Sequence, residues 1–312
     1  MAILANTFLP FSAIGNREDL QDYIYNISPT DTPFQKLCGM KPVKAQYHEW
    51  QTQSLAAAAA NAQLVGDDVA SFDAANTTTR VGNRTQISRK TLSISRTQEQ
   101  IDKAGRNSEK LLQTQLKSKE LRRDMELVIT NNQASVVGNS TTAPQLRSLE
   151  SWITTNNQAG ATGAVGSSTA ARTDGTQRAL TRAMVLTAAQ QCWTAGGEPT
   201  ILMVGAFNRG VVSGFASYGT RFQDDSNKKL TATLDIIETD FGTLKVVPNR
   251  FQRDRTAFVL DASLHDIGYL SKPKVEDLAK TGDAENAMIV TEYTYISKQE
   301  SGNAIIADLT TS

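Results

Sequence analysis

The chain has 312 residues, and 32 Lys and Arg side chains stand against 32 Asp and Glu, so its formal net charge is zero. A protein that grips nucleic acid electrostatically usually carries a basic domain or stripe, and this sequence shows none. Hydrophobic residues make up 39% of the chain and aromatic residues 6%, which is lean for this length and indicates that part of the chain lies outside any core.

The first segment, residues 1–42, reads as an extended arm with local turns. Asp31 is placed to cap a short helix whose first turn carries Pro33, because aspartate is a favoured N-cap residue and proline is tolerated at the first helical position. Phe34 is the one large aromatic side chain after this turn. We therefore expect Phe34 to anchor the arm.

Residues 43–52 and 84–95 both alternate between apolar and polar side chains, which predicts two strands that could pair. The segment between them holds few large apolar residues and cannot bury much surface. A long irregular loop inside a compact domain is unusual unless the loop is functional. We expect residues 43–95 to form a projecting β-hairpin, which needs a surface to lie on because an isolated ribbon is marginal in water.

Residues 97–132 predict one long helix, since apolar residues recur at helical spacing and charged residues fill the other faces. At 1.5 Å per residue, such a helix would span roughly 50 Å. Gly105 is its weak point. A coiled coil is the alternative, but the apolar spacing drifts away from a strict heptad.

The second half alternates helices with mostly non-consecutive strands, which predicts an α+β fold. Residues 156–175 form a low-complexity loop rich in glycine and small polar residues. We expect helices at 176–194 and 207–215, and strands at 200–204, 244–247, 257–261, 288–296 and 304–309.

Targeting signals are not evident. Residues 1–10 lack the basic stretch and the apolar core of a signal peptide, and no run approaches the ~18 apolar residues of a membrane span. Cys38 and Cys192 lie far apart, outside any C-x-x-C motif, and read as small buried side chains in a reducing compartment. We expect the protein to be made and kept in a cytoplasm, with no membrane partner.

No catalytic, cofactor or metal constellation can be found in the sequence. The two histidines, His48 and His265, belong to no zinc-binding motif, and neither a nucleophile elbow nor a phosphate-binding loop is present. The enzyme alternative would need a pocket that brings His48, His265 or Cys192 beside an acid. We expect no enzyme and no cofactor.

Five features in order resemble the major capsid proteins of tailed bacteriophages, which have the Hong Kong 97-type capsid fold. These features are the I-S-P-T-D-T-P-F stretch at 27–34, the hairpin, the long helix, the apolar patch at 149–153 before a loop, and the ending from E-Y-T at 292–294 to A-D-L at 307–309. The match in order covers nearly the whole chain. It implies a structural subunit that self-assembles through hexamers and pentamers into the icosahedral head around phage DNA.

The resemblance also implies a division of the chain. Residues 1–42 would be the N-terminal arm, 43–95 the extended loop over the adjacent subunit, and 96–175 the peripheral domain with its spine helix at 97–132. Residues 176–269 would form the axial domain, and 270–312 would return to the peripheral domain. The arm would have no scaffolding segment before it, so scaffolding would be a separate protein.

The expected partners are copies of the chain, a portal, and separate scaffolding or decoration proteins, with non-specific contact to packaged double-stranded DNA. The virion capsid is the expected location. The alternative structural role is a viral or surface-layer subunit that forms tubes or sheets.

Seven residues are predicted to contact neighbouring subunits. Three belong to the arm and four are basic residues of the hairpin, where little surface is buried and acidic groups of a neighbour could pair with them: Asp31, Pro33, Phe34, Arg80, Arg84, Arg89 and Lys90.

Overall fold

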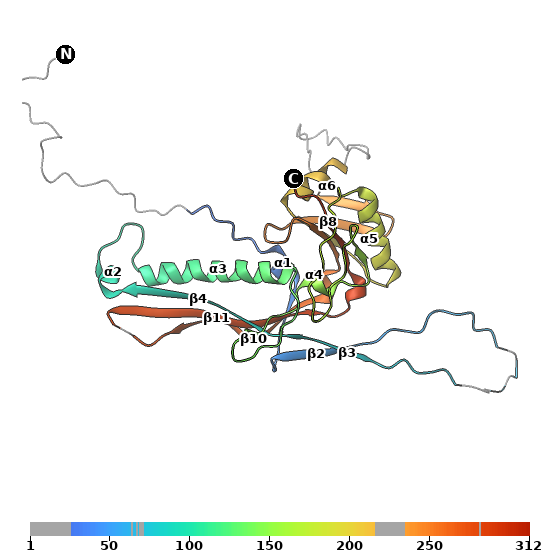
Figure 1. Cartoon of the computed structure of the whole chain (residues 1–312), viewed down its shortest axis with the longest axis horizontal. Coiled ribbons are helices and arrows are strands. Elements are labelled where there is room, and N and C mark those ends of the chain that lie inside the picture. The colour runs from blue at the N-terminus through green and yellow to red at the C-terminus, as the bar shows by residue number, and fades with distance from the viewer. Residues whose placement is uncertain (1–25, 64, 67, 69–71, 216–234, 281) are drawn as a thin grey trace, which may run out of the picture.

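The computed structural model describes residues 26–63, 65, 66, 68, 72–215, 235–280 and 282–312. Most of the predicted arm, residues 1–25, lies outside the described part. The molecule is elongated, with a long helix over a sheet at one end, a mixed body beside it, and a thin two-stranded ribbon that projects beyond the body (Figure 1).

The helices are α1 (Pro33–Leu37), α2 (Arg96–Gln100), α3 (Glu109–Thr130), α4 (Leu149–Trp152), α5 (Arg182–Thr194) and α6 (Ala206–Gly214). The strands are β1 (Gly39–Pro42), β2 (Tyr47–Thr52), β3 (Thr79–Arg84), β4 (Gln86–Ser95), β5 (Asn157–Gln158), β6 (Ile201–Val204), β7 (Ile236–Thr239), β8 (Gly242–Pro248), β9 (Thr256–Leu260), β10 (His265–Asp277), β11 (Ala284–Ser297) and β12 (Ala304–Ala307). The predicted α+β class is confirmed, because the helices do not alternate with the strands of one parallel sheet. No helix in the described ranges is both long enough and apolar enough to cross a membrane.

A four-stranded sheet of order β1-β10-β11-β4 lies under α3. Only β1 and β10 run parallel; the other neighbours are antiparallel. Leu92 and Ile94 of β4 turn one apolar face inward, and with Ala287 they form a small separate cluster. This sheet and α3 form the elongated end in Figure 1.

A six-stranded sheet of order β5-β12-β9-β6-β8-β7 forms the body. Its central strands are buried on both faces, which explains why β6 reads as a continuous apolar run rather than an alternating one. Ile201 and Met203 point into the core shared with α3 and the four-stranded sheet. Leu202 and Val204 point to the opposite face, which α5 and α6 cover.

The glycine-rich loop at 156–175 is held down by the carboxylate of Asp308. This buried carboxylate accepts hydrogen bonds from Gly160 N at 2.9 Å and Gly175 N at 2.8 Å, and it pairs with Arg172 at 3.0 Å. Arg172 and Asp308 are each only 1% exposed at the side chain, so the ion pair is shielded from solvent. A loop whose single large apolar side chain, Val165, is exposed is thus ordered by polar contacts with the C-terminal segment.

The predicted helix at 97–132 is wrong in its first part. Residues 101–108 interrupt it, with Gly105 in the left-handed region at φ 75°. Ser108 then caps α3 by accepting a hydrogen bond from Leu111 N at 3.2 Å, and Ser95 caps α2 in the same way through Gln98 N. The spine helix therefore has 22 residues, about 33 Å of rise.

The predicted pairing of 43–52 with 84–95 is also wrong. β2 pairs with β3, which lies in the stretch interpreted as loop, while β4 pairs with β11 over ten residue pairs from Tyr293↔Gln86 to Ala284↔Ser95. The ribbon ends at Arg84, and the next strand, β4, joins the four-stranded sheet under α3. Local alternation could not distinguish these partners, because β11 lies about 200 residues further along the chain.

The other predicted elements are mostly confirmed, with small shifts of their ends. The helix expected at 176–194 begins only at Arg182, after the Thr181 cap. The strands β6, β8, β9, β11 and β12 are present at the expected places. Sequence patterns did not predict β1, β7 or β10, which are edge strands or carry polar, mostly exposed residues along much of their length.

Candidate assembly surfaces

The projecting ribbon packs on the rest of the chain near its root, where Trp50 and Val81 contact the core. β2 and β3 pair in register from Tyr47↔Arg84 to Thr52↔Thr79. Beyond the strands, the two sides stay joined by amide contacts: Gln53 Nε2 donates to Asn76 O at 2.8 Å, and Asn76 Nδ2 donates to Ser54 O at 3.0 Å. Figure 1 shows this segment reaching past the body on the side opposite α3.

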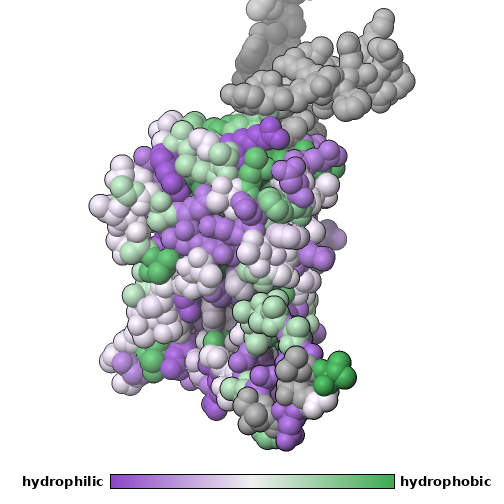
Figure 2. All heavy atoms as spheres, turned by 90° about the vertical axis from the view of Figure 1, so that its right-hand side faces the viewer, coloured by the Kyte–Doolittle hydropathy of each residue, from purple (hydrophilic) through white to green (hydrophobic). Residues whose placement is uncertain are grey.

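The described residues near the tip expose apolar side chains to solvent. Leu55 is 96% exposed, Val65 is fully exposed, and Phe72 is 91% exposed. Figure 2 views the molecule from this end, and hydrophobic groups are scattered among hydrophilic ones without one broad patch. Such a segment gains stability only when another surface covers it, and contacts spread along its length would add together.

The root of the ribbon is fixed by the buried side chain of Asn83. Its Nδ2 donates to Arg147 O at 2.9 Å and to Tyr295 O at 2.8 Å, while its Oδ1 accepts from Arg147 N at 2.8 Å and Arg84 N at 2.9 Å. One side chain therefore joins β3 to the segment before α4 and to β11. The direction of the ribbon is set at this point.

An aromatic contact supports the same root. The Trp50 ring of β2 lies 5.4 Å from the Trp152 ring of α4, and the Arg147 guanidinium lies 4.4 Å from the centre of the Trp152 ring on its face. Trp152 is 6% exposed, so this contact is largely shielded from water.

The arm is anchored by Glu126 of α3, a fully buried carboxylate. Glu126 Oε1 accepts from Phe34 N at 2.7 Å, and Oε2 accepts from Gln35 N at 3.0 Å. Asn249 follows β8, and its Nδ2 donates a hydrogen bond to the same Oε1 of Glu126 at 2.8 Å. Burial raises the pKa of Glu126, and the two backbone N–H groups of α1 oppose that rise.

Glu126 takes the capping role that we predicted for Asp31. The residue before α1 is Thr32, which makes no side-chain capping bond, and Asp31 instead pairs with the exposed Lys36. The short helix binds the carboxylate of another element because its own sequence supplies no cap. The predicted cap at Asp31 is therefore wrong.

Pro33 and Phe34 are buried inside their own chain. Phe34 is 0% exposed and lies 5.7 Å from the His265 ring and 5.9 Å from the Tyr295 ring, measured between ring centres. It thus anchors the arm to the body, as expected, but it offers no surface to a neighbour.

The four basic residues differ in their partners. Arg80 makes a bidentate pair with Glu49 across the ribbon, at 2.8 and 2.5 Å, and Lys90 pairs with Asp124 of α3 at 2.6 Å. Arg84 lies over the Tyr47 ring at 4.9 Å. Arg89 is exposed and forms no ion pair within the described ranges.

The three residues that an enzyme would have to bring together, His48, His265 and Cys192, lie in separate parts of the fold. His48 lies on the ribbon, Cys192 lies on the buried face of α5, and His265 is buried against Phe34 and Tyr295. His265 Nδ1 is 2.6 Å from the Tyr295 hydroxyl, and its Nε2 is 3.0 Å from Asn303 Oδ1. Since that amide oxygen can only accept, His265 donates from Nε2, and the hydroxyl donates to Nδ1. No group of His, Cys, Asp and Glu that could hold a metal occurs among the described residues.

His265 makes the fold sensitive to acid. Burial lowers its pKa to about 4, whereas an unfolded histidine titrates near 6.5. The contribution of His265 to stability therefore falls as the pH drops below 6.5, because only the unfolded chain protonates this side chain there; between pH 7 and 5 this contribution falls by about 2 kcal/mol. Burial raises the pKa of Glu150 to about 7, and this group acts in the opposite direction over the same range, so the contribution of His265 is measured as a difference between variants. Urea unfolding at both pH values measures it. Relative to the parent, His265→Asn should shift the change in stability between pH 7 and 5 by about 2 kcal/mol in the favourable direction, and His48→Asn should shift it much less. Equal changes in all three proteins would refute the assignment.

Sequence reasoning missed the residues that position both projections. Glu126 read as one charged residue on a long helix, and Asn83 as part of a polar loop. Both find their partners 64 to 212 residues away in the chain. The only local signal was that Glu126 lies between Met125 and Val128–Ile129, on the apolar side of its helix.

Known proteins resemble this chain over nearly its whole length. The family described as SU10 major capsid protein matches residues 4–310. A major capsid protein of Escherichia phage Phieco32 is 26% identical, and the match covers 91% of this chain and 92% of that protein.

Solved structures share the fold at low identity. The capsid asymmetric unit of cyanophage A-1(L) has a TM-score of 0.68 at 12% identity and covers 95% of this chain and 98% of that one. A structure of phage G major capsid proteins with decoration proteins has a TM-score of 0.56 at 9% identity and covers 99% and 100%.

Proposed function

The chain belongs to the family of SU10 major capsid proteins, and we propose that its copies close into the shell of a phage head through hexamers and pentamers. It is a structural protein of the virion rather than an enzyme, and its fold is the Hong Kong 97-like capsid fold that the resemblance implied. Contacts that close into rings and then into a shell fit the symmetry of such assemblies.

The observation that carries the proposal is the ribbon of β2 and β3, rigid at its root and exposed at its tip. We assign its tip to the surface of an adjacent subunit. There the apolar side chains of the tip would be covered and its free backbone groups would find partners.

We propose the domain division with two refinements. Residues 1–42 act as the arm, 43–95 contain the extended loop, and 96–175 with 270–312 build the peripheral domain, leaving 176–269 for the axial domain. The pairing of β4 with β11 supports assigning 86–95 to the peripheral sheet, and the pairing of β12 with β9 supports assigning 304–307 to the axial sheet.

Further partners belong to the same proposal. A portal and separate scaffolding or decoration proteins would act with the shell, and the phage G structure contains decoration proteins. With zero formal charge, the inner face would touch packaged double-stranded DNA without sequence preference. Assembly would take place in the host cytoplasm.

Arg84 and Arg89 are the basic residues that we assign to neighbouring subunits, because Arg80 and Lys90 already have acidic partners in the chain. The double variant Arg84→Ala, Arg89→Ala is expected to leave the free subunit intact and to lower the salt concentration at which particles dissociate. Light scattering during a salt titration measures this. Arg80→Ala serves as the matched control. If particles of the parent and of the double variant dissociate at the same salt concentration, Arg84 and Arg89 do not bind neighbouring subunits.

The experiment that tests the loop assignment shortens the ribbon. Since Thr52 pairs with Thr79, an Asn-Gly turn can replace residues 53–78 and join the two strands directly. The variant is expected to fold, to unfold cooperatively like the parent, and to form no closed shells. Normal shells would contradict the assignment, and tubes or sheets from the parent chain would favour the alternative structural role.

A further inference from the structure

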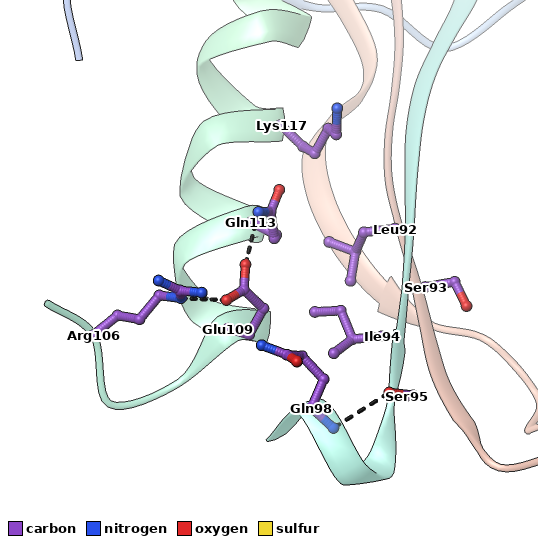
Figure 3. Close-up of a pocket in the computed structure, with 9 residues that line it drawn as sticks. All are labelled: Leu92, Ser93, Ile94, Ser95, Gln98, Arg106, Glu109, Gln113 and Lys117. Carbon is purple, nitrogen blue, oxygen red and sulfur yellow. Dashed lines mark hydrogen bonds and ion pairs between the residues drawn. The ribbon is translucent and has the colours of Figure 1, made fainter. Parts of the chain in front are cut away.

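Helix α3 separates its charged residues into two sides. Figure 3 shows the side that faces β4, where Arg106 binds the carboxylate of Glu109 and Lys117 points toward the strands. Lys117 also pairs with Glu120 at 2.9 Å. The cations on this side therefore have acidic partners within the chain.

The opposite side of α3 carries cations without such partners. Lys119 stands two residues after Lys117, which turns it about 200° around the helix. Lys119 and Arg122 are exposed and Arg123 is half-buried, and none of the three forms an ion pair with a described residue. In Figure 1 the strands lie on one side of α3, and no described helix or strand covers the other side between the start of α3 and α1.

A fourth cation comes from a distant part of the chain. Asn249 Nδ2 binds Glu126 of α3, and the Phe251 ring centre lies 5.8 Å from the Arg123 guanidinium. The turn at 249–251 is thus held against α3, and it places the exposed Arg250 beside the helix. Local patterns in the sequence showed no basic stripe because the structure assembles it from separate segments. We call these four residues the basic patch: Lys119, Arg122, Arg123 and Arg250.

The basic patch is unfavourable for the isolated subunit. Lys119 lies three residues before Arg122 and four before Arg123, so their side chains are neighbours on the helix, and like charges at such spacing destabilise it. Glu126, the acid of the next turn, is fully buried and already accepts hydrogen bonds from α1 and from Asn249. It offers no exposed countercharge, so the surface suits a partner that carries several negative charges.

Double-stranded DNA is the polyanion that a phage head encloses. It carries one negative charge per about 1.7 Å of its axis, and lysine and arginine side chains bind its phosphates without reading the bases. Side chains three and four residues apart on a helix are about 5–6 Å apart, so several cations of the basic patch could bind one stretch of backbone.

Two acidic segments of the chain itself fit the basic patch less well. Residues 17–22 hold three acids but also one base, which leaves part of the positive charge without a partner. Residues 65–73 hold three acids, but the exposed side chains of Val65 and Phe72 stand among them. These side chains need an apolar cover, which a cluster of cations does not provide.

We propose that the basic patch lies on the inner face of the shell and binds the phosphate groups of packaged double-stranded DNA. The inference rests on the proposed assembly and names the residues of one contact within it. Every subunit would present the basic patch once, so contacts that are weak singly would add together over the shell.

Acetylation of lysine side chains in intact particles tests the partner. Lys119 is expected to react about five-fold more slowly in DNA-filled heads than in empty shells, because bound phosphates would shield its amine. Mass spectrometry gives both rates. Lys117 is the control, because it belongs to the same helix, faces β4 and should react equally in both particles. Equal rates for Lys119 would overturn the proposal, whether the side chain is open in both particles or covered by a neighbouring copy in both.

A charge variant of the unassembled subunit provides a second measurement. Glutamine replaces three cations of the basic patch: Lys119→Gln, Arg122→Gln and Arg123→Gln. The variant is expected to fold, because it removes repulsion between like charges. Binding of a DNA duplex of about 20 base pairs is followed by fluorescence anisotropy at rising salt. The slope of log K against log salt should fall in magnitude by about 2 to 3, since each lost phosphate contact removes about 0.9.

A control variant has the same net charge and changes three exposed cations elsewhere in the fold: Arg182→Gln, Lys245→Gln and Lys272→Gln. Its slope should change by less than about 1. Equal slopes for the parent and the patch variant would overturn the inference, while shells of the parent chain would leave the proposed function standing. Failure of the parent chain to form shells at all would overturn the proposed function and this inference with it.

Discussion

Replacing Glu126 by alanine is expected to lower the free energy of unfolding by about 4 kcal/mol and to release the arm. The carboxylate is fully buried and accepts from two N–H groups of α1 and from the Asn249 amide. Without it, three donors lose their acceptor in the interior. Denaturant unfolding measures the loss of stability, and trypsin cleavage after Lys36 should accelerate as α1 detaches.

The same helix offers a matched control for this variant. Glu120 is partly exposed and pairs with Lys117, so Glu120→Ala should cost less than about 1 kcal/mol and leave cleavage at Lys36 unchanged. Phe34→Ala should reproduce the release of the arm, because it empties a buried site of the core. Equal effects of the Glu126 and Glu120 variants would refute the role of Glu126 as the anchor.

Asn83→Ala is expected to cost about 3 kcal/mol and to stop assembly even where the subunit still folds. The side chain makes four hydrogen bonds, and alanine would remove the buried partner that it supplies to the Arg147 N–H and to the carbonyls of Arg147 and Tyr295. The ribbon would then lose the contact that fixes its direction. Thermal unfolding gives the change in stability, and electron microscopy of the product shows assembly.

Asn76→Ala provides the comparison within the same ribbon. Asn76 also bonds across the hairpin, through Gln53 and Ser54, but its contacts are exposed to water. Its replacement should change stability by less than about 0.5 kcal/mol and should allow shells to form. Normal assembly by Asn83→Ala would show that the root does not orient the ribbon.

Sequence patterns predicted those helices and strands that are determined by residues close together in the chain. A long helix within 97–132, the strands β6 and β9, and the projecting character of the ribbon follow from spacing and from a shortage of apolar residues. The interruption near Gly105 was foreseen as a weak point but not as a break. Helix α2 ends at Gln100, where Ile101 is extended, and Ser108 caps the start of α3 after the left-handed Gly105.

The contacts that position the projections could not be predicted in the same way. In the sequence, Glu126 is one of several charged residues on a helix, whereas in the structure it accepts hydrogen bonds from α1. The pattern of β4 is equally consistent with pairing to β2, but β4 pairs with β11. Both outcomes depend on residues more than 90 positions away, which pattern and spacing do not reveal.

The most direct measurement is to express the chain alone and examine the product by negative-stain electron microscopy, with its mass from light scattering. The account predicts closed angular shells or rings of the size of a hexamer. A stable monomer of 33.9 kDa would contradict it, because the arm and the ribbon would then have no neighbour to bind.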